Sequence, residues 1–325
     1  MRVSISALRH LGLGALDRLG YPADEAERIF EVLLYAEMRG NDQGVVKLIG
    51  EGLRRDAAAK PITVESRSGV SAVIDGGRNA GILVLRHAAD LAAELAEQNG
   101  IALVGTTNTS TSTGALGYYV RQLANAGLVG LAFAGSKPTV APLGSYEPKF
   151  GTNPIAVGIP AEGAPFVFDM ATSAITWYSL VAAAEARRPI PAGVAFDSAG
   201  ASTTDPAAAM QGGAIEPFDH GHKGFGLSML VAILTGPLIG ADPAAGSWGN
   251  LILAFNPGLL RDPAAAAADV ARLIGSVKGA KRRPTVDEIL VPGERGDRLA
   301  AQNTTDGTVE LDEAVYRALT GGDGS

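Results

Sequence analysis

The chain has 325 residues, enough for one large domain or two ordinary ones, and its 46% hydrophobic and 19% charged residues exclude an intrinsically disordered protein. A net charge of −7 and a pI near 5.2 disfavour binding to nucleic-acid backbones and anionic membrane surfaces, because both need a positive field, and favour a small-molecule partner. The absence of cysteine excludes disulfides and thiolate metal sites and fits a reducing compartment. Arg9, Asp17 and Arg18 interrupt the apolar N-terminus, so we expect no export signal and a cytoplasmic protein.

The first part of the chain has the pattern of a helical region. Apolar residues recur at helical spacing through residues 23–38, with Gly40 just beyond the end. An earlier set of leucines between Leu8 and Leu19 indicates another helix. Residues 40–52 then read as a polar connector.

From about residue 68 the pattern changes to short apolar or β-branched runs bounded by glycine or proline, which predict strands. These runs are residues 70–74, 101–105, 128–134 and 166–168. Helical segments at about 81–98 and 115–126 lie between them, which is typical of an α/β sandwich. Residues 153–158 and 251–255 would add strands outside a simple strand–helix–strand rhythm, so we expect a mixed sheet rather than a parallel one.

The C-terminal part returns to helix at residues 263–274 and 310–319, and the N-terminal helices are its obvious packing partner. The predicted fold class is therefore α/β (α+β), with a mixed-sheet domain and a small helical subdomain formed by both termini. The predicted boundaries are residues 68–259 for the former and residues 1–67 with 260–325 for the latter. The apolar run 227–241 is broken by Pro237 and is too short to span a bilayer, so we interpret it as a buried core helix.

The common phosphate-binding motifs are missing. Gly12 and Gly14 follow no predicted strand, and Gly221, Gly224 and Gly226 have the wrong spacing for G-x-G-x-x-G. The remaining candidates are polar segments at strand ends and helix starts, where backbone N–H groups and hydroxyls can hold a phosphate-bearing ligand.

Four such segments are present. Residues 106–114 form a run of hydroxyl and amide side chains before a predicted helix, and we favour a ligand contact over a helix N-cap, which needs only one or two of them. Taken singly, residues 151–154 and 169–173 are more readily structural. The fourth segment, 218–224, contains two histidines, but we expect no metal because no third ligand is visible.

Together, these segments and their order resemble the malate/L-lactate dehydrogenase family, which includes ureidoglycolate and sulfolactate dehydrogenases and cyclic ketimine reductases. The matching stretches are Ala36–Gly40, Gly114–Tyr119, Ala141–Pro142, Gly151–Ala156, Asp169–Ser173, Thr203–Pro206, His222–Gly224 and Pro292–Glu294. The resemblance implies a domain that binds NAD or NADP without a Rossmann motif, usually in a homodimer, and a small-molecule carboxylate as substrate.

The same resemblance implies roles for particular residues. The cofactor would lie against Ser112, Thr113, Gly114, Ala115 and Leu116; Met170, Ala171 and Thr172; His222 with Lys223; and the 292–296 turn with Gly293 and Glu294. Thr152 and Lys47 would face the substrate carboxylate. Lys47 stands where the family usually has arginine, which keeps the positive charge but loses the bidentate fork that matches a carboxylate.

The acid–base residues depart from the family pattern. The family pattern that the resemblance implies is Asp-Ser-His-Gly, and its histidine protonates the reduced carbonyl. This chain has Asp42-Gln43-Gly44 at that place, which is one residue shorter and lacks the histidine. A second histidine of the family is replaced by Ser112. Glutamine cannot deliver a proton near neutral pH, and serine does so only with an activated partner. Asp197 resembles the family's histidine-orienting aspartate; it could act directly or through water, or be an ordinary solvated turn carboxylate.

These departures leave three functional hypotheses. The leading one is hydride transfer between a nicotinamide cofactor and a 2-oxo or 2-hydroxy carboxylate, with Lys47, Tyr118 or Tyr119 as candidates to replace the histidine. The second is reduction of a cyclic or N-alkyl 2-imino acid, because a protonated imine already carries its proton. The third is a cofactor-binding homologue with impaired catalysis.

Overall fold

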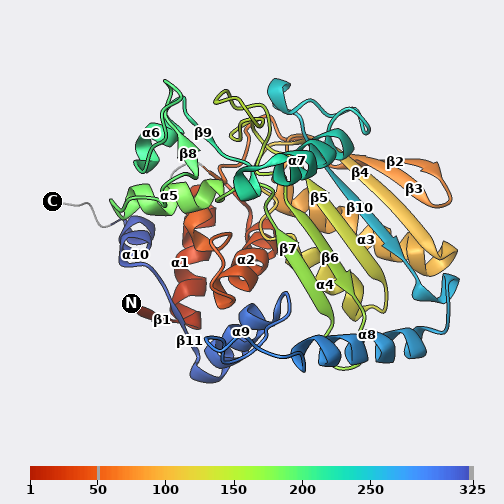
Figure 1. Cartoon of the computed structure of the whole chain (residues 1–325). Helices are drawn as coiled ribbons and strands as arrows, with labels where there is room; N and C mark the ends of the chain where they lie inside the picture. The colour runs from red at the N-terminus through yellow and green to blue at the C-terminus, as the bar shows by residue number, and fades with distance from the viewer. Residues whose placement is uncertain (50–51, 322–325) are drawn as a thin grey trace.

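The two ends of the chain meet in the computed structural model, which describes residues 1–49 and 52–321. The strand β1 (Arg2–Ser4) pairs with β11 (Thr308–Glu310) in a two-stranded antiparallel sheet at the lower left of Figure 1. Both strands are short, and the sheet joins sequence positions that are about three hundred residues apart.

Helices from both termini pack around this small sheet. They are α1 (Ile5–Arg18), α2 (Ala23–Met38), α9 (Glu294–Asp306) and α10 (Glu313–Thr320), with α1 against α10 and α2 against α9. Ser4 caps the first turn of α1 through a hydrogen bond from the Ala7 N–H. The predicted helical subdomain formed by both termini is therefore confirmed, whereas its residue boundaries stay a prediction.

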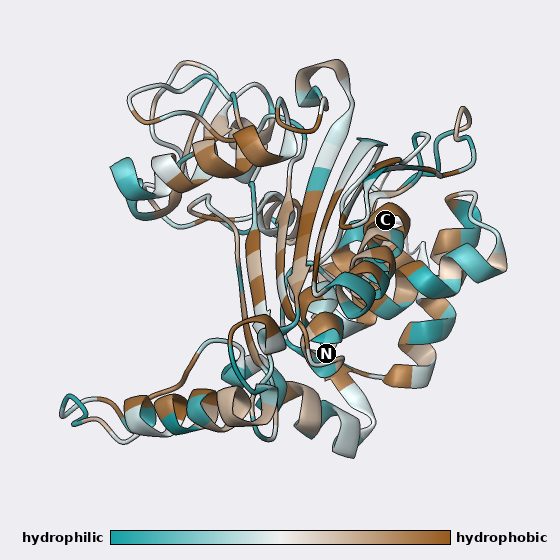
Figure 2. Cartoon of the chain, turned by 90° about the vertical axis from the view of Figure 1, so that its right-hand side faces the viewer, coloured by the Kyte–Doolittle hydropathy of each residue, from teal (hydrophilic) through white to brown (hydrophobic). Residues whose placement is uncertain are grey.

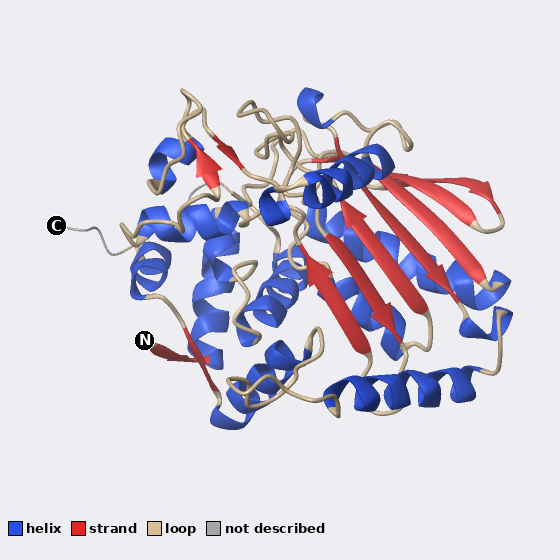
Figure 3. Cartoon of the chain, in the orientation of Figure 1, coloured by secondary structure: helices blue, strands red, loops and turns tan. Residues whose placement is uncertain are grey.

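A seven-stranded mixed sheet forms the other half of the molecule (Figure 3), in the order β2-β3-β4-β10-β5-β6-β7. The strands are β2 (Thr63–Ser68), β3 (Ser71–Asp75), β4 (Ile101–Thr109), β5 (Val129–Ala134), β6 (Ile155–Ile159), β7 (Phe166–Met170) and β10 (Trp248–Phe255). Only β3 and β4 run parallel, and the other neighbouring pairs are antiparallel. The mixed sheet is as predicted, but β2 was missed because its side chains are all exposed and give no apolar pattern.

One face of the sheet is covered by α3 (Gly81–Asn99) and α4 (Gly117–Asn125). The buried side chains on this face lie directly opposite one another across the strands: Val104, Ile252, Ala132 and Ala156. The next position in this row is Asp169 on β7. The strand register therefore carries a carboxylate to the covered face of the sheet.

The opposite face is only partly covered by α7 (His222–Thr235), which lies across β10 and β5. The helix is brown along most of its length in Figure 2, yet Met229, Leu230 and Ile233 are each about half exposed. The prediction of a buried core helix was thus wrong for one side of α7, because the sheet covers only the other side. No helix in the described parts of the chain is both long and apolar enough to cross a membrane.

The remaining elements connect these layers. They are η1 (Val45–Leu48), α5 (Trp177–Glu185), β8 (Ala195–Phe196), α6 (Pro206–Met210), β9 (Ala214–Ile215), η2 (Phe218–His220), η3 (Pro243–Ala245), η4 (Pro257–Leu259) and α8 (Pro263–Lys278). A second, smaller hydrophobic cluster lies beneath α5, α6 and the β8–β9 pair. The predicted polar connector at 40–52 contains η1, whose side chains are all buried.

Candidate functional site

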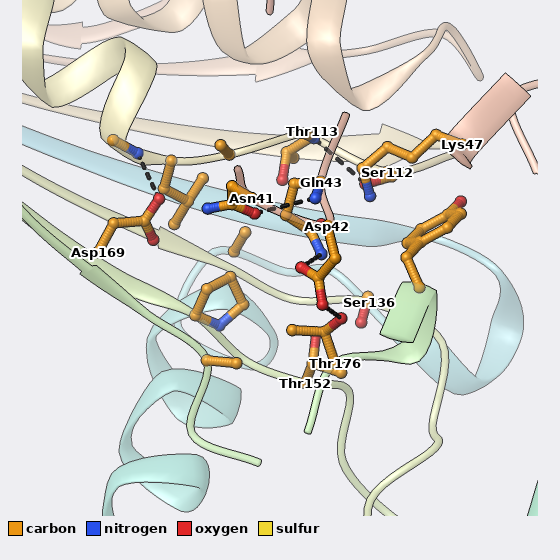
Figure 4. Close-up of a pocket in the computed structure, with 18 of the residues that line it drawn as sticks. Asn41, Asp42, Gln43, Lys47, Ser112, Thr113, Ser136, Thr152, Asp169 and Thr176 are labelled. Atoms are coloured by element: carbon orange, nitrogen blue, oxygen red, sulfur yellow. Dashed lines mark hydrogen bonds between the residues drawn. The ribbon is translucent and has the colours of Figure 1, made fainter. Parts of the chain in front are cut away.

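A pocket of about 1700 Å³ opens between the helical subdomain and the sheet. Its wall comes from the segment after α2, the 110–117 loop between β4 and α4, the end of β7, and the 290–297 segment that leads into α9. These segments are far apart in the sequence, and Figure 4 shows side chains converging from the segment after α2, the 110–117 loop and the end of β7. The pocket is larger than a typical small-molecule site of about 300–1,000 Å³, so it has room for a dinucleotide and a small acid together.

The structure brings most of the predicted site residues to this pocket. The wall includes Gln43, Lys47, Ser112, Thr113, Gly114, Ala115, Leu116, Thr152, Met170, Ala171 and Gly293. They were selected from five separate stretches of sequence, and the fold places all of them around one cavity.

Five predicted residues do not line the pocket. The Thr172 hydroxyl is buried and donates to the Asn153 carbonyl, and His222 and Lys223 are exposed at the start of α7. Glu294 accepts hydrogen bonds from the Val291 N–H and, on the other carboxylate oxygen, from Lys278.

The fifth residue, Asp197, lies in a turn after β8. Its carboxylate accepts hydrogen bonds from the backbone N–H groups of Ala199 and Ala201, both 2.9 Å away. This is the turn-carboxylate alternative raised by the sequence, and Asp197 is outside the pocket wall.

The Gln43 loop is held from beneath by a buried carboxylate. Glu37 on α2 accepts a hydrogen bond from the Val45 N–H at 2.9 Å, and burial raises the pKa of Glu37 to about 7. Gly44 leaves no space for a side chain, because a Cβ there would lie 2.1 Å from Glu37 Oε2. The loop therefore presents Gln43 to the pocket in a fixed position.

Asp42 links this loop to α5. Its Oδ2 accepts a hydrogen bond from the Thr176 hydroxyl at 2.8 Å and another from Ser179, while Oδ1 accepts from the Gln43 side-chain amide at 3.1 Å. Because its amide N–H is used in this way, Gln43 keeps its carbonyl oxygen and a second N–H for a ligand.

Lys47 lies behind Ser112 in the pocket wall. Its side chain has no exposed surface, and Nζ donates to Ser112 Oγ at 2.8 Å (Figure 4). Nζ also lies 3.4 Å from the centre of the Tyr178 ring. Burial lowers the pKa of Lys47 well below that of an ordinary lysine, and the nearby Asp42 partly opposes the shift.

Asp169 projects from the end of β7 toward the first turn of α4. It accepts a hydrogen bond from the Gly117 N–H at 2.7 Å, and burial raises its pKa to about 6. The Gly117 bond favours the charged form and Asp42 disfavours it. Asp169 thus lines the pocket with a pKa above that of an ordinary carboxyl group.

An ion-pair cluster joins the helices at the other end of the pocket. Arg121 on α4 contacts both carboxylate oxygens of Asp297 on α9, at 2.6 and 2.7 Å. Arg39, after α2, lies 3.3 Å from the same carboxylate and stacks on the Tyr35 ring at 3.7 Å. These side chains fix the position of α9 and hence of the Gly293 turn at its start.

The composition of the wall suits a ligand rich in phosphate and hydroxyl oxygens. The Thr139 hydroxyl is buried in the wall and finds no hydrogen-bond partner among the described residues. Gly293 has φ +85°, and a Cβ there would lie 2.6 Å from the Val167 carbonyl oxygen, so glycine lets this turn of the wall pack directly against β7. The residues present therefore fit a dinucleotide.

Sequence reasoning missed several residues of the pocket. Asp42, Asp169, Arg121, Tyr178 and Asp297 all line it. Asp169 stood inside a stretch that carried the family resemblance, and Asp42 stood in the segment compared with the family's Asp-Ser-His-Gly, so both had a usable signal. Arg121 and Asp297 lie on helical faces that look like ordinary solvated surface in the sequence.

Of the three candidates to replace the lost histidine, only Lys47 reaches the pocket. Tyr119 is buried and donates to the Thr113 carbonyl at 2.5 Å, and burial raises its pKa well above the usual value. Tyr118 lies outside the pocket wall and contacts Glu31 at 3.5 Å.

Comparisons with known proteins agree with the resemblance. Residues 3–320 match the family model for malate/L-lactate dehydrogenase. The chain is 33% identical to L-sulfolactate dehydrogenase from Methanothermobacter thermautotrophicus, over 94% of this chain and 92% of that protein. It is also 33% identical to Delta(1)-pyrroline-2-carboxylate reductase 1 from Burkholderia ambifaria, over 97% and 95% of the two chains. The crystal structure of a dehydrogenase from Sinorhizobium meliloti superposes with a TM-score of 0.88 at 29% identity, covering 99% of this chain and 97% of that one.

Proposed function

The chain belongs to the malate/L-lactate dehydrogenase family, and on that premise we propose that it is a cytoplasmic oxidoreductase that uses NAD or NADP and a small 2-oxo or 2-hydroxy carboxylate. The observation that carries the proposal is the single pocket wall that contains both groups of residues implied by the resemblance. Ser112–Leu116, Met170, Ala171 and Gly293 form the proposed cofactor side. Gln43, Thr152 and Lys47 form the proposed substrate side.

When bound, the reduced nicotinamide supplies a hydride to the substrate carbon. The chain's own residues orient the substrate: the Gln43 amide and the Thr152 hydroxyl offer hydrogen bonds, and Lys47 lies in the same wall. Lys47 acts from behind Ser112, so its contact with a carboxylate is indirect in this arrangement.

The test is a substrate panel with the purified protein. NADH or NADPH is mixed with 2-oxo acids and with cyclic 2-imino acids, and the loss of near-ultraviolet absorbance from the reduced nicotinamide is followed. Turnover of a 2-oxo acid, together with the reverse reaction on the matching 2-hydroxy acid, is the expected result. Binding of neither cofactor, measured by quenching of tryptophan fluorescence, would refute the proposal.

A second candidate function is reduction of a cyclic or N-alkyl 2-imino acid. Gln43 at the position of the family's histidine favours it, because a protonated imine needs no proton donor. The similarity to a pyrroline-2-carboxylate reductase also supports it. Turnover of piperideine- or pyrroline-2-carboxylate, without turnover of pyruvate, would establish this reading, and cofactor binding without any turnover would indicate the third, a catalytically impaired homologue.

We further propose that the protein is a homodimer that uses the partly covered face of the sheet. On this face Leu103, Leu253, Leu131, Val157 and Phe168 lie in register across the strands, and none is fully buried. The exposed apolar residues of α7 continue the same surface. An apolar area of this extent is typical of a protein interface.

A further inference from the structure

The Lys47 amine is a buried ionisable group with an unusual set of neighbours. It has no exposed surface, it donates to Ser112 Oγ at 2.8 Å, and it lies 3.4 Å from the centre of the Tyr178 ring. A lysine that only anchored a carboxylate would point its ammonium group into the pocket. The Lys47 amine instead donates to the hydroxyl of Ser112, which has surface open to the pocket.

The hydrogen bonds of Ser112 determine which way its own proton points. Oγ accepts from Lys47 Nζ and also from the Gly114 N–H, at 3.2 Å. A hydroxyl has two acceptor positions and one donor, so both acceptor positions are filled. The O–H is left to donate, and Ser112 is the member of the pair with surface open to the pocket.

The groups that face Lys47 favour easy loss and gain of its proton. Asp42, from the loop after α2, is the charged group that stabilises the ammonium form, and Tyr178, from α5, is a neutral ring because burial raises its pKa to about 12. Of the other helices packed against η1, α2 carries the titratable Glu37, whose carboxylate accepts from the Val45 N–H. The helices α1 and α10 have apolar buried faces that include Leu8 and Val315. Lys47 has no ion-pair partner among the residues that the structure describes, and burial of such an amine destabilises its charged form relative to the neutral one.

We propose that Lys47 and Ser112 replace the family's histidine as the proton source for carbonyl reduction, with Ser112 as the group that touches the substrate oxygen and Lys47 as the proton reservoir behind it. The proposal rests on the proposed oxidoreductase function and names its acid–base residues. It changes the role of Lys47 from carboxylate anchor to proton donor.

When the substrate carbon accepts a hydride, the carbonyl π electrons become a lone pair on oxygen. The Ser112 O–H bond breaks as its proton passes to that oxygen, and Ser112 regains a proton from the Lys47 ammonium, which becomes a neutral amine. Solvent protonates the amine before the next turnover. In oxidation of a 2-hydroxy acid the neutral amine receives the proton by the same route in reverse.

The decisive experiment compares two substrate classes in two variants, Lys47→Met and Ser112→Ala. General acid catalysis contributes on the order of 100- to 10,000-fold, so we expect kcat/KM for 2-oxo acid reduction to fall at least 100-fold in each variant. Reduction of a protonated cyclic imine, which brings its own proton, should fall less than about 5-fold. Lys281→Met and Ser276→Ala, at exposed positions of the C-terminal region, are the matched controls and should change neither rate.

A pH profile separates proton transfer from a structural role. Reduction of a 2-oxo acid should slow as pH rises through the pKa of Lys47, below the range of an ordinary lysine, and oxidation of the 2-hydroxy acid should accelerate through the same pKa. In Lys47→Met, the rates of reduction and of oxidation should both lose this dependence on pH. Without cofactor or substrate, NMR of protein labelled with ¹³C at lysine Cε should show one resonance titrating at that pKa, absent from Lys47→Met.

The outcomes distinguish the two proposals. If the wild type reduces 2-oxo acids and both variants retain that rate and its pH profile, the proton pair is refuted while the proposed function stands. An equal loss with both substrate classes in correctly folded variants also refutes the pair, because it indicates a structural or binding role. A wild type that reduces imines alone refutes it as well, since no proton donor is then needed, and a wild type that turns over neither class refutes the proposed function first.

Discussion

The Asp169 carboxylate accepts a hydrogen bond from the Gly117 N–H at 2.7 Å, which joins the end of strand β7 to the first turn of α4. The interaction places an acidic group at a helix N-terminus, where negative charge is favoured. Burial raises the pKa of Asp169, and its effect is larger than the opposing effect of the hydrogen bond, so the pKa rises to about 6.

Asp169→Asn tests this balance through the pH dependence of stability. The folded-state pKa is raised above the usual value near 3.8, so the native protein binds the proton more tightly and loses stability as pH rises from about 4 to 6. Asparagine does not titrate, so the variant does not lose this stability. The difference in free energy of unfolding, variant minus wild type, should therefore be about 1–3 kcal/mol larger at pH 7 than at pH 4. Urea unfolding at the two pH values measures it. The exposed Asp90→Asn is the control, and a difference for Asp169→Asn that does not change with pH would contradict the prediction.

Gly44→Ala should disturb the loop that carries Gln43. The added Cβ would lie 2.1 Å from Glu37 Oε2, so the loop or the carboxylate must move. We expect a loss of about 1–3 kcal/mol in the free energy of unfolding and a lower kcat/KM for whichever substrate the panel identifies.

The matched control is Gly275→Ala in the last turn of α8, where a Cβ meets nothing within 4 Å. Alanine should stabilise that helix by up to about 1 kcal/mol, because glycine is the weaker helix former. Thermal unfolding of the two variants should therefore move in opposite directions, and a Gly44→Ala protein as stable and active as wild type would show that the loop is not held as described.

Arg121→Met should weaken cofactor binding, although Arg121 does not contact the reacting atoms. Arg121 makes a two-point contact with Asp297 and thereby docks α9, whose first residues follow the Gly293 turn. We expect the Kd for the reduced cofactor to rise at least about 10-fold, with a loss of about 1–3 kcal/mol in stability, because the variant leaves a partly buried carboxylate with weaker pairing. Fluorescence titration measures the Kd. Arg272→Met, which removes an exposed pair with Asp269 on α8, should leave both quantities unchanged.

Ile233→Glu tests the proposed homodimer. Ile233 is 45% exposed on the uncovered side of α7, so a charge there is tolerated in an isolated chain but opposes burial against a second copy. Sedimentation equilibrium should show a dimer for wild type and a shift toward monomer for the variant. Val64→Glu, at a similarly exposed apolar residue of β2, should stay dimeric. A monomeric wild type would refute the proposal directly.

Local patterns predicted most of the individual elements. The helices at 23–38 and 81–98 and the strands of the central sheet were visible as apolar periodicities, because side chains that face a core repeat with the geometry of the backbone. Two of the elements that were missed have no such pattern. β2 is exposed along its length, and α9 buries only Asn303.

The sequence by itself determined which residue types were available for the chemistry. Gln43 and Ser112 in place of histidines, and Lys47 in place of arginine, can be read from the chain, because side-chain identity fixes which groups donate, accept or titrate. It also showed that polar segments at strand ends were the candidates for ligand binding.

Only the tertiary structure decided which of these groups act together. It placed Lys47 against Ser112, sixty-five positions away, moved Tyr119 out of reach, and left Asp197 in a turn of its own. Burial is a property of the packed chain, and a pKa depends on the solvent and charges that packing removes or supplies. A lysine that looks like a carboxylate anchor in the sequence therefore becomes a candidate proton donor once the fold has enclosed it.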